Sequence, residues 1–247
     1  MIVGPTDIET LISVGRPTVA SDGSFAVFAT SRPDISADRN VGQLWRIELP
    51  SGEPRRLTRG VADTSPRLSP DGGHVAFLRG DADGKAQIHV IEASGSEPVQ
   101  VTDAPLGVGS FAWAPAGDVL AYTARVPESG RYGTIDGLAP EAESPRRITG
   151  IRWHANGVGY IADRPAHVFV VAAPDLGSEP SYETAPGPQT SSSTRARRVP
   201  EAARQLTSGS RSHDGVVFTA DGTEILTTTD EIEHDRRDLR SPLVAVR

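Results

Sequence analysis

Four polar residues near the C-terminal end have the types that nucleophilic hydrolases combine. Ser210, Ser212, His213 and Asp214 lie within five residues of one another. A serine, a histidine and an aspartate can act as nucleophile, general base and orienting group. Neighbouring residues on a strand point to opposite faces, however, so His213 and Asp214 cannot line up behind one serine. We therefore interpret this cluster as the polar start of a strand.

Other catalytic and metal-binding patterns are missing from the sequence. The motif G-x-S-x-G, which exposes a nucleophilic serine on a sharp turn, occurs around none of the 25 glycines. The segment 81–84 resembles the opening of a calcium loop but lacks the glutamate that closes it. The six histidines have no metal-ligand spacing, and there is no cysteine. We expect no catalytic residue, no cofactor and no metal.

The overall composition excludes two classes of partner. Lys and Arg number 25 against 32 Asp and Glu, which gives a net charge of −7 and no general positive field for nucleic acid. No apolar run approaches the about 20 residues of a membrane span. Residues 1–14 lack the basic start and the apolar run of an export signal, so we expect a cytoplasmic location and no contact with membranes.

A repeat organises the elements that must position these side chains. Turn glycines recur at roughly 40–45 residues once a Pro/Ser/Thr-rich insertion is set aside, and such a period with four short strands per unit is typical of a β-propeller blade. Each unit has a strand, a turn with Gly, a second and a third apolar strand, and a closing Leu-Thr or Ile-Thr. The turn glycines are Gly23, Gly72, Gly117, Gly157 and Gly222.

The sequence therefore predicts an all-β chain, a partial β-propeller of four-stranded antiparallel blades over residues 1–247. About five blades are expected, near 15–58, 64–102, 109–149, 151–207 and 212–247. We expect residues 174–198 to form a flexible insertion between the third and fourth strands of the fourth blade, because they contain few apolar residues. Thr6 and Glu9 predict a short helix over 7–14.

The inner strands matter most for function, because in a propeller they surround the central channel. Arg67, Trp113, Arg152 and His213 are the candidates to line that channel and filter what enters. The alternative is that these four side chains only pack or pair between blades. The inner-strand segments 17–21, 66–70, 111–115, 151–155 and 216–220 contain no carboxylate, which argues against a lactone hydrolase with a central divalent ion.

Two stretches carry a family resemblance. The turn Ser69–Gly72 with HVAFLR after it, and above all PRRITGIRWHANGVGYIADRPAHVFVV at 145–171, resemble the N-terminal propeller of serine peptidases of the prolyl oligopeptidase family, in its acylaminoacyl-peptidase-like branch. The likeness covers nearly the whole chain outside the insertion. It implies a propeller of about seven blades followed by an α/β-hydrolase domain that carries the catalytic Ser, Asp and His. Against that pattern this chain has about five blades and no hydrolase domain, so we interpret it as truncated.

The resemblance implies a function without catalysis by this chain. We expect a gating propeller that selects substrates for a serine peptidase acting on short peptides, of acylaminoacyl or dipeptidyl peptidase type. The alternative is a stand-alone binding or scaffold propeller of the Tol-Pal translocation protein type, which shares the SPDG turn. Expected partners are short peptides and a C-terminal α/β-hydrolase domain. Open blade edges also predict self-association.

Overall fold

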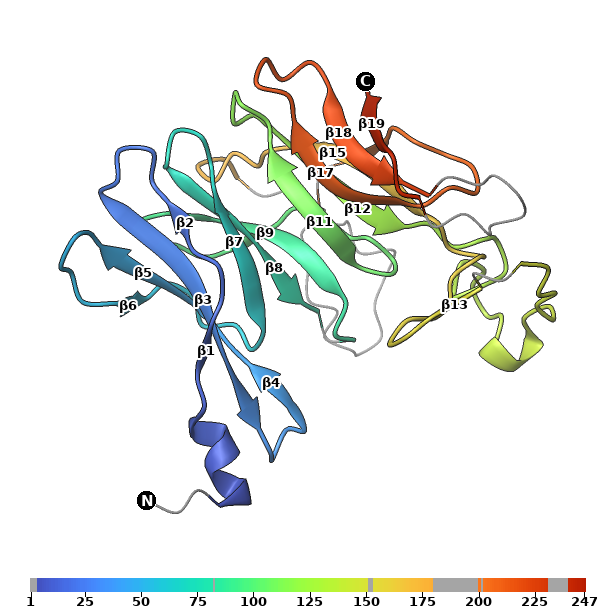
Figure 1. The fold of residues 1–247 in the computed structure, drawn as a ribbon, viewed down its shortest axis with the longest axis horizontal. Coiled ribbons are helices and arrows are strands. Elements are labelled where there is room, and N and C mark those ends of the chain that lie inside the picture. The colour runs from blue at the N-terminus through green and yellow to red at the C-terminus, as the bar shows by residue number, and fades with distance from the viewer. Residues whose placement is uncertain (1–3, 82, 151–152, 180–199, 201, 231–239) are drawn as a thin grey trace, which may run out of the picture.

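The chain folds into successive antiparallel sheets that lie side by side in an open arc (Figure 1). The computed structural model describes residues 4–81, 83–150, 153–179, 200, 202–230 and 240–247. Apart from two short 3-10 helices, η1 (Pro5–Thr10) and η2 (Pro140–Ala142), every regular element among these residues is a strand. The predicted all-β propeller-blade fold is confirmed. The described strands do not close into a ring.

The first sheet, blade one, pairs its strands in the order β1-β3-β5-β6, and β2 and β4 also pair with β3. Its long central strand is buried on both faces near its start, as expected of a blade covered by a neighbour. The strands are β1 (Ser13–Val14), β2 (Thr18–Val19), β3 (Phe25–Asp34), β4 (Arg39–Val41), β5 (Leu44–Glu48) and β6 (Arg55–Arg56).

Blade two is a regular four-stranded meander in the order β10-β9-β8-β7. Its first hairpin shows why the SPDG turn forms. Gly72 has a φ of 73° and donates its N–H to the Ser69 carbonyl at 2.9 Å, and Asp71 accepts from the Gly73 N–H at 3.0 Å. The strands are β7 (Asp63–Leu68), β8 (His74–Gly80), β9 (Ala86–Glu92) and β10 (Val99–Gln100).

Blade three combines strands from two of the predicted blades. Its order is β11-β12-β15-β16, with β11 (Val108–Trp113), β12 (Val119–Arg125), β15 (Ala166–Ala172) and β16 (Arg204–Gln205). The predicted third and fourth blades, 109–149 and 151–207, thus share this one sheet, because β12 pairs with β15 from Val119↔Ala172 to Arg125↔Ala166. No strand forms over 145–149. Blade four has three strands, β17 (His213–Phe218), β18 (Ile225–Thr229) and β19 (Leu243–Val246).

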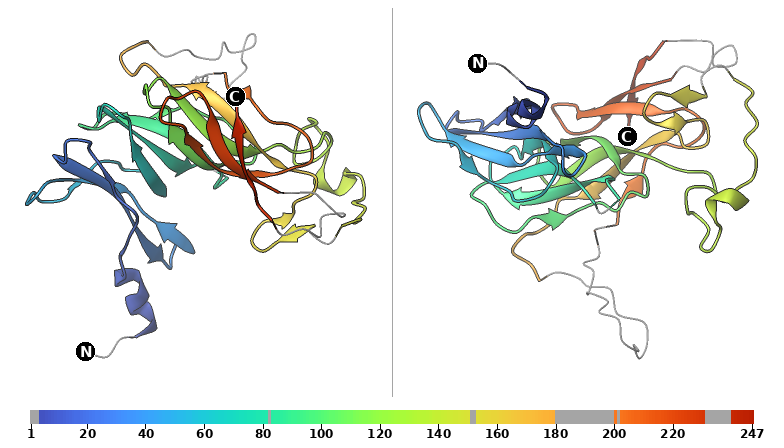
Figure 2. Two further views of the ribbon diagram at one scale, coloured as in Figure 1. Left: turned by 45° about the horizontal axis from the view of Figure 1, so that its top comes forward. Right: turned by 90° about the horizontal axis from the view of Figure 1, so that it is seen from below.

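The segment 126–165, here called the excursion, leaves blade three and returns to it. It contains η2 and a separate hairpin of β13 (His154–Ala155) and β14 (Gly159–Tyr160), and it projects away from the sheets (Figure 2). Gly157 makes the predicted turn, with a φ of 71°. Neither strand of the hairpin has a buried residue, so the hairpin offers no apolar face to a neighbouring blade. In the part of the chain that the structure describes, four sheets form the arc and the β13-β14 hairpin is a separate fifth sheet, where the sequence predicted about five blades.

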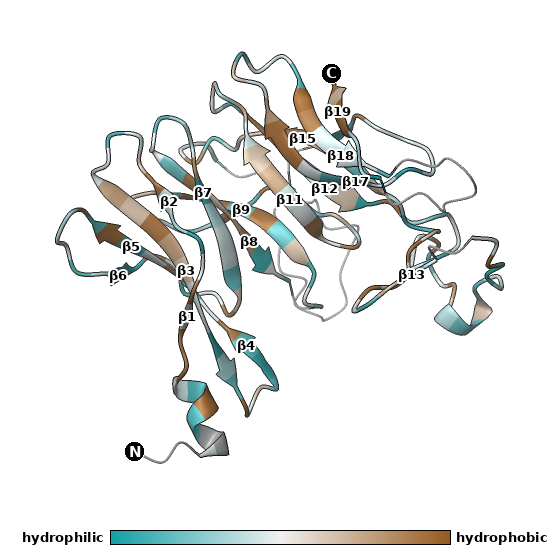
Figure 3. Ribbon diagram, viewed as in Figure 1, coloured by the Kyte–Doolittle hydropathy of each residue, from teal (hydrophilic) through white to brown (hydrophobic). Residues whose placement is uncertain are grey.

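Three apolar clusters join the blades. One lies between blades one and two around Val27, Leu44 and Phe77. A second lies between blades two and three around Ile88 and Leu120, and a third joins blades three and four. Figure 3 shows apolar residues along β3, β5 and β15. Burial of one blade by the next is therefore the main source of stability.

Two local predictions, the N-terminal helix and the insertion, have different outcomes. The predicted helix over 7–14 is wrong in extent: η1 begins at Pro5, Asp7 accepts from the Gly4 N–H at 2.7 Å, and Ser13–Val14 pairs with β3 instead. The predicted insertion 174–198 does lie between β15 and β16. Its residues 180–198 are outside the described residues, so its flexibility stays a prediction.

Candidate functional site

The first strands of blades two, three and four meet at a groove of about 550 Å³, here called the inner groove. It is lined from β7 by Ser65, Arg67 and Leu68, from β11 by residues 109–113, and from β17 by residues 215–217. Pro70 and Leu78 complete it. Its volume lies within the range of about 300–1,000 Å³ that is usual for small-ligand sites.

Each of these three strands carries a register shift at the groove. The shifts fall between Thr64 and Arg67, between Val108 and Phe111, and between Asp214 and Val217. The residues at these irregularities include Ser65, Ser110 and Gly215, which lie the same number of residues before their turn glycines. β-Bulges interrupt the ladder and re-aim side chains, and they are frequent next to functional sites.

Arg67 is the one charged residue among the described residues that lines the inner groove. It is exposed, and its Nη1 donates to the Pro66 carbonyl at 3.1 Å. Among the described residues no carboxylate forms an ion pair with it. The nearby Asp63 is fully buried and is engaged by Arg79 through two hydrogen bonds of 2.7 and 2.9 Å. Arg67 is therefore free to bind an anionic group.

Trp113 serves the inner groove and the blade interface together. Its indole Nε1 donates to the Arg67 carbonyl at 3.1 Å, and its ring packs against the cluster between blades two and three. The side chain thus fixes β7 against β11 while it walls the inner groove. Both roles considered for Trp113, channel lining and packing between blades, are compatible with this position.

His213 and Arg152 are the other two side chains predicted to line the channel. His213 lines a different hollow of about 310 Å³, beside Thr123 and Arg125. Its Nδ1 is buried without a hydrogen-bond partner among the described residues, its ring lies 6.3 Å from that of His167, and burial lowers its pKa. Arg152 lies outside the described residues. The predicted role of these four side chains in a channel stays a prediction.

The cluster at 212–214 is not arranged as a catalytic relay. Ser212 Oγ accepts from the Ala166 N–H at 3.2 Å, and Asp214 Oδ1 accepts from the Gly215 N–H at 2.9 Å. Ser212 and Asp214 thus accept hydrogen bonds from backbone N–H groups instead of binding the next member of a triad. Within the described part of the chain, no three His, Asp or Glu side chains gather so that they could hold a metal ion.

Sequence reasoning missed a second groove, here called the N-terminal groove, of about 300 Å³ between β1, β3 and β7. Arg16 and Arg67 are the charged residues that line it. Arg16 lies as far before Gly23 as Ser65 lies before Gly72. A position-by-position alignment of the repeat units could have identified the N-terminal groove.

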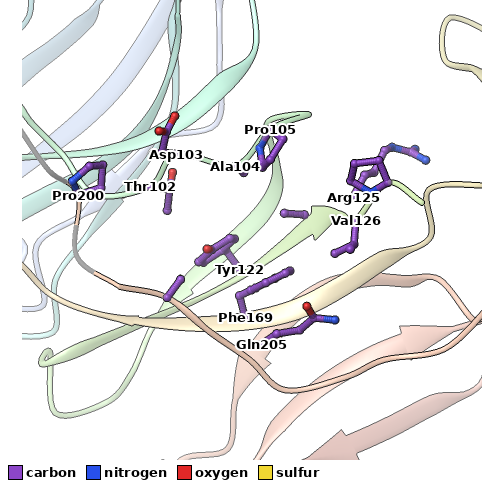
Figure 4. A pocket seen from close by; sticks show the side chains of 13 residues that line it. Thr102, Asp103, Ala104, Pro105, Tyr122, Arg125, Val126, Phe169, Pro200 and Gln205 are labelled. Atoms are coloured by element: carbon purple, nitrogen blue, oxygen red, sulfur yellow. The ribbon is translucent and has the colours of Figure 1, made fainter. Parts of the chain in front are cut away.

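A third hollow, of about 380 Å³, lies between blades two and three (Figure 4). Its floor is the stacked pair Tyr122 and Phe169, whose ring centroids are 5.2 Å apart with a 12° interplanar angle. Burial raises the pKa of Tyr122 to about 12. The lining is mostly apolar and includes Pro105 and Val126. This hollow could not be predicted from the sequence, because it forms only where two blades meet.

The edges of the arc expose apolar side chains. Val14 and Val19 of blade one and Leu243 of blade four are 65%, 50% and 64% exposed. Such side chains favour association when they gather on one surface. Self-association stays a prediction, which light scattering at micromolar concentration checks: a stable monomer would contradict it. No described helix has the length and apolar character to cross a membrane.

The sheets and the inner face define a β-propeller fold, and comparison of sequences relates the chain to peptidases. No protein-family profile matches it. It is 26% identical over 172 residues to the uncharacterized peptidase YuxL of Bacillus subtilis, covering 69% of this chain and 26% of that protein. It is 28% identical over 123 residues to dipeptidyl-peptidase 5 of Porphyromonas endodontalis, covering 49% of this chain and 18% of that protein. The predicted resemblance to peptidases is confirmed.

Comparison of structures agrees on the fold. The acylaminoacyl peptidase of Pyrococcus horikoshii superposes with a TM-score of 0.62 at 12% identity, covering 96% of this chain and 31% of that one. At this identity the match shows the fold alone. The chain spans about a quarter of the length of its first curated relative.

Proposed function

We propose that this chain is the substrate-selecting propeller of a serine peptidase that acts on short peptides, and that it supplies no catalytic group itself. The observation that carries the proposal is its sequence similarity to two peptidases, over a stretch that is only a small part of each. The catalytic serine would then belong to an α/β-hydrolase partner domain.

The inner groove supports selection by size and shape. Register shifts in β7, β11 and β17 interrupt the ladder at its wall, and an extended peptide can pair with backbone groups that a ladder leaves open. Trp113 and Val217 offer apolar surface beside these groups. A folded protein buries its own backbone and cannot enter such a groove, so selection would come from sterics.

The alternative, a stand-alone scaffold propeller of the Tol-Pal type, is the weaker explanation because both curated relatives are peptidases. No contact or surface among the described residues favours it.

The proposal is tested by binding and hydrolysis on the same sample. Fluorescein-labelled tetrapeptides should bind the 247-residue chain in an anisotropy titration, and the same sequence within a folded carrier protein should not. Mass spectrometry should find the peptides uncut, and a fluorophosphonate probe should label no serine, because the cluster at 212–214 forms no relay. Absence of peptide binding would refute the selecting role, and labelling at Ser212 would refute the non-catalytic one.

A further inference from the structure

We propose that the inner face of the arc, formed by the inner groove and the N-terminal groove, binds a carboxylate of the peptide through Arg67 and Arg16. This inference rests on the proposed function, because it names the chemical group by which the propeller recognises its substrate. Neither arginine pairs with a carboxylate of the described residues, and that is the first observation in its favour.

The charge of the inner face is opposite to that of the chain. The net charge is −7, yet the charged residues that line the two grooves are Arg16 and Arg67, and no carboxylate among the described residues lines either one. The one acidic side chain at the start of β7, Asp63, is fully buried and paired with Arg79. A carboxylate is attracted where positive charge is not neutralised, so these grooves are the favoured place on this surface.

Arg67 lies between the two grooves and lines both. A guanidinium presents a planar fork of N–H donors that matches a carboxylate in bidentate geometry. The Nη1 bond to the Pro66 carbonyl leaves the other donors of Arg67 for such a ligand. Arg16 is exposed on the neighbouring inner face of blade one and can add a second donor group.

The backbone that carries Arg67 is held in place. Its carbonyl accepts from Trp113 Nε1 at 3.1 Å, and Leu68 N–H donates to Thr18 Oγ1 at 3.2 Å. Ser65, two residues earlier, has a φ of 55° in the left-handed region, which a residue other than glycine adopts only where the surrounding structure imposes it. A fixed backbone lowers the entropy lost when a ligand binds.

The test measures binding of acetyl-Ala-Ala-Phe and of its C-terminal amide by isothermal titration calorimetry at low ionic strength. The free acid should bind about tenfold more tightly, the effect of one charge-assisted bidentate pair. The variant Arg67→Gln should remove this preference, Arg67→Lys should retain part of it, and Arg16→Gln should weaken it. Arg147→Gln, an exposed arginine of the excursion, is the matched control and should bind like the unaltered chain.

A third peptide identifies the source of the carboxylate. If acetyl-Ala-Ala-Asp amide binds as the free acid does, the site accepts a side-chain carboxylate; if it binds as the amide does, the site requires the C-terminus, and both results support the proposal. Equal affinity of acid and amide, or an acid preference that survives Arg67→Gln, would overturn it while peptide binding stands. Failure of every peptide to bind would remove the proposed function as well.

Discussion

Blade two and the excursion differ in what holds them together. In blade two, Val75, Phe77 and Ile88 are fully buried and pack against the blades on either side. In the described residues of the excursion, the buried side chains are Arg131 and Asp163. One region is stabilised by apolar burial shared with its neighbours, and the other by a polar network of its own.

That network converges on one carboxylate. Asp163 accepts from Arg146 Nε at 2.8 Å and from Tyr132 Oη at 2.9 Å, and Arg131 Nε lies 3.4 Å from it. The guanidinium of Arg164 lies 4.5 Å from the centre of the Tyr132 ring. Charges that are mostly removed from water need such partners, because each is costly without them. The excursion can therefore be ordered without contributing to the core between blades.

The largest expected effect is the loss of an aromatic ring from blade two. Phe77→Ala should lower the free energy of unfolding by about 3–5 kcal/mol, because it leaves a cavity in the cluster between blades one and two. Urea denaturation checks this. Ile148→Ala in the excursion is the control: its side chain is 53% exposed, so the change should be within about 0.5 kcal/mol. Similar losses of stability in Phe77→Ala and Ile148→Ala would contradict the difference between blade two and the excursion.

A smaller effect is expected when the polar network is broken. Asp163→Asn keeps the shape of the side chain but removes the charge that Arg131 and Arg146 share, and should cost about 1–3 kcal/mol. The loss should be local, so trypsin should cut within the excursion faster than it does in the unaltered chain. Asp136→Asn, an exposed carboxylate of the same segment, should change neither rate nor stability. Global unfolding of Asp163→Asn would show that the excursion supports the blades.

The smallest effect is a pH dependence carried by blade two. Burial lowers the pKa of His89, so the folded chain binds its proton less readily than the unfolded chain does. The stability from neutral His89 is full above pH about 6.5, the pKa of a free histidine, and is lost as pH falls through the lowered folded value. His89→Gln should flatten this loss between pH 8 and 5. His167 and His213 have lowered pKa values and act in the same direction.

The carboxylates of the hairpin turns do not disturb that measurement. Hydrogen bonds from Ser69 and Thr219 lower the pKa of Asp71 and Asp221, so both stay ionised above pH 5. If the pH dependence of stability persists unchanged in His89→Gln, it comes from the histidines between blades three and four.

The same comparison explains what the sequence could predict. Turn chemistry is local, so all five turn glycines were found, and each has a positive φ. The pairing of strands is not local. The hairpin at Gly157 has the turn of a blade but lacks its buried strands, and the sequence pattern alone did not separate the two cases.

The candidate site, too, could be predicted only in part. Arg67 was predicted at the inner face because its strand could be placed from the repeat. The inner and N-terminal grooves could not be predicted, because their walls come from three sheets and from two sheets, respectively. They also include irregular positions such as Ser65, whose residue type does not indicate a positive φ. His213 begins β17, the first strand of blade four, but which hollow it lines depends on how blade four packs on blade three.

The excursion also bears on the order in which the chain folds. In blade two each strand pairs with the next one along the chain, whereas in blade three Arg125 must find Ala166. Closing a loop of about forty residues instead of about six costs roughly 2 kcal/mol more in chain entropy, and pairing of high contact order is slow. We expect blade two to form first, and β11 and β12 then to pack against its apolar face. The return of β15 would then be the late step of assembly, and the period during which an edge of β12 is open to other chains.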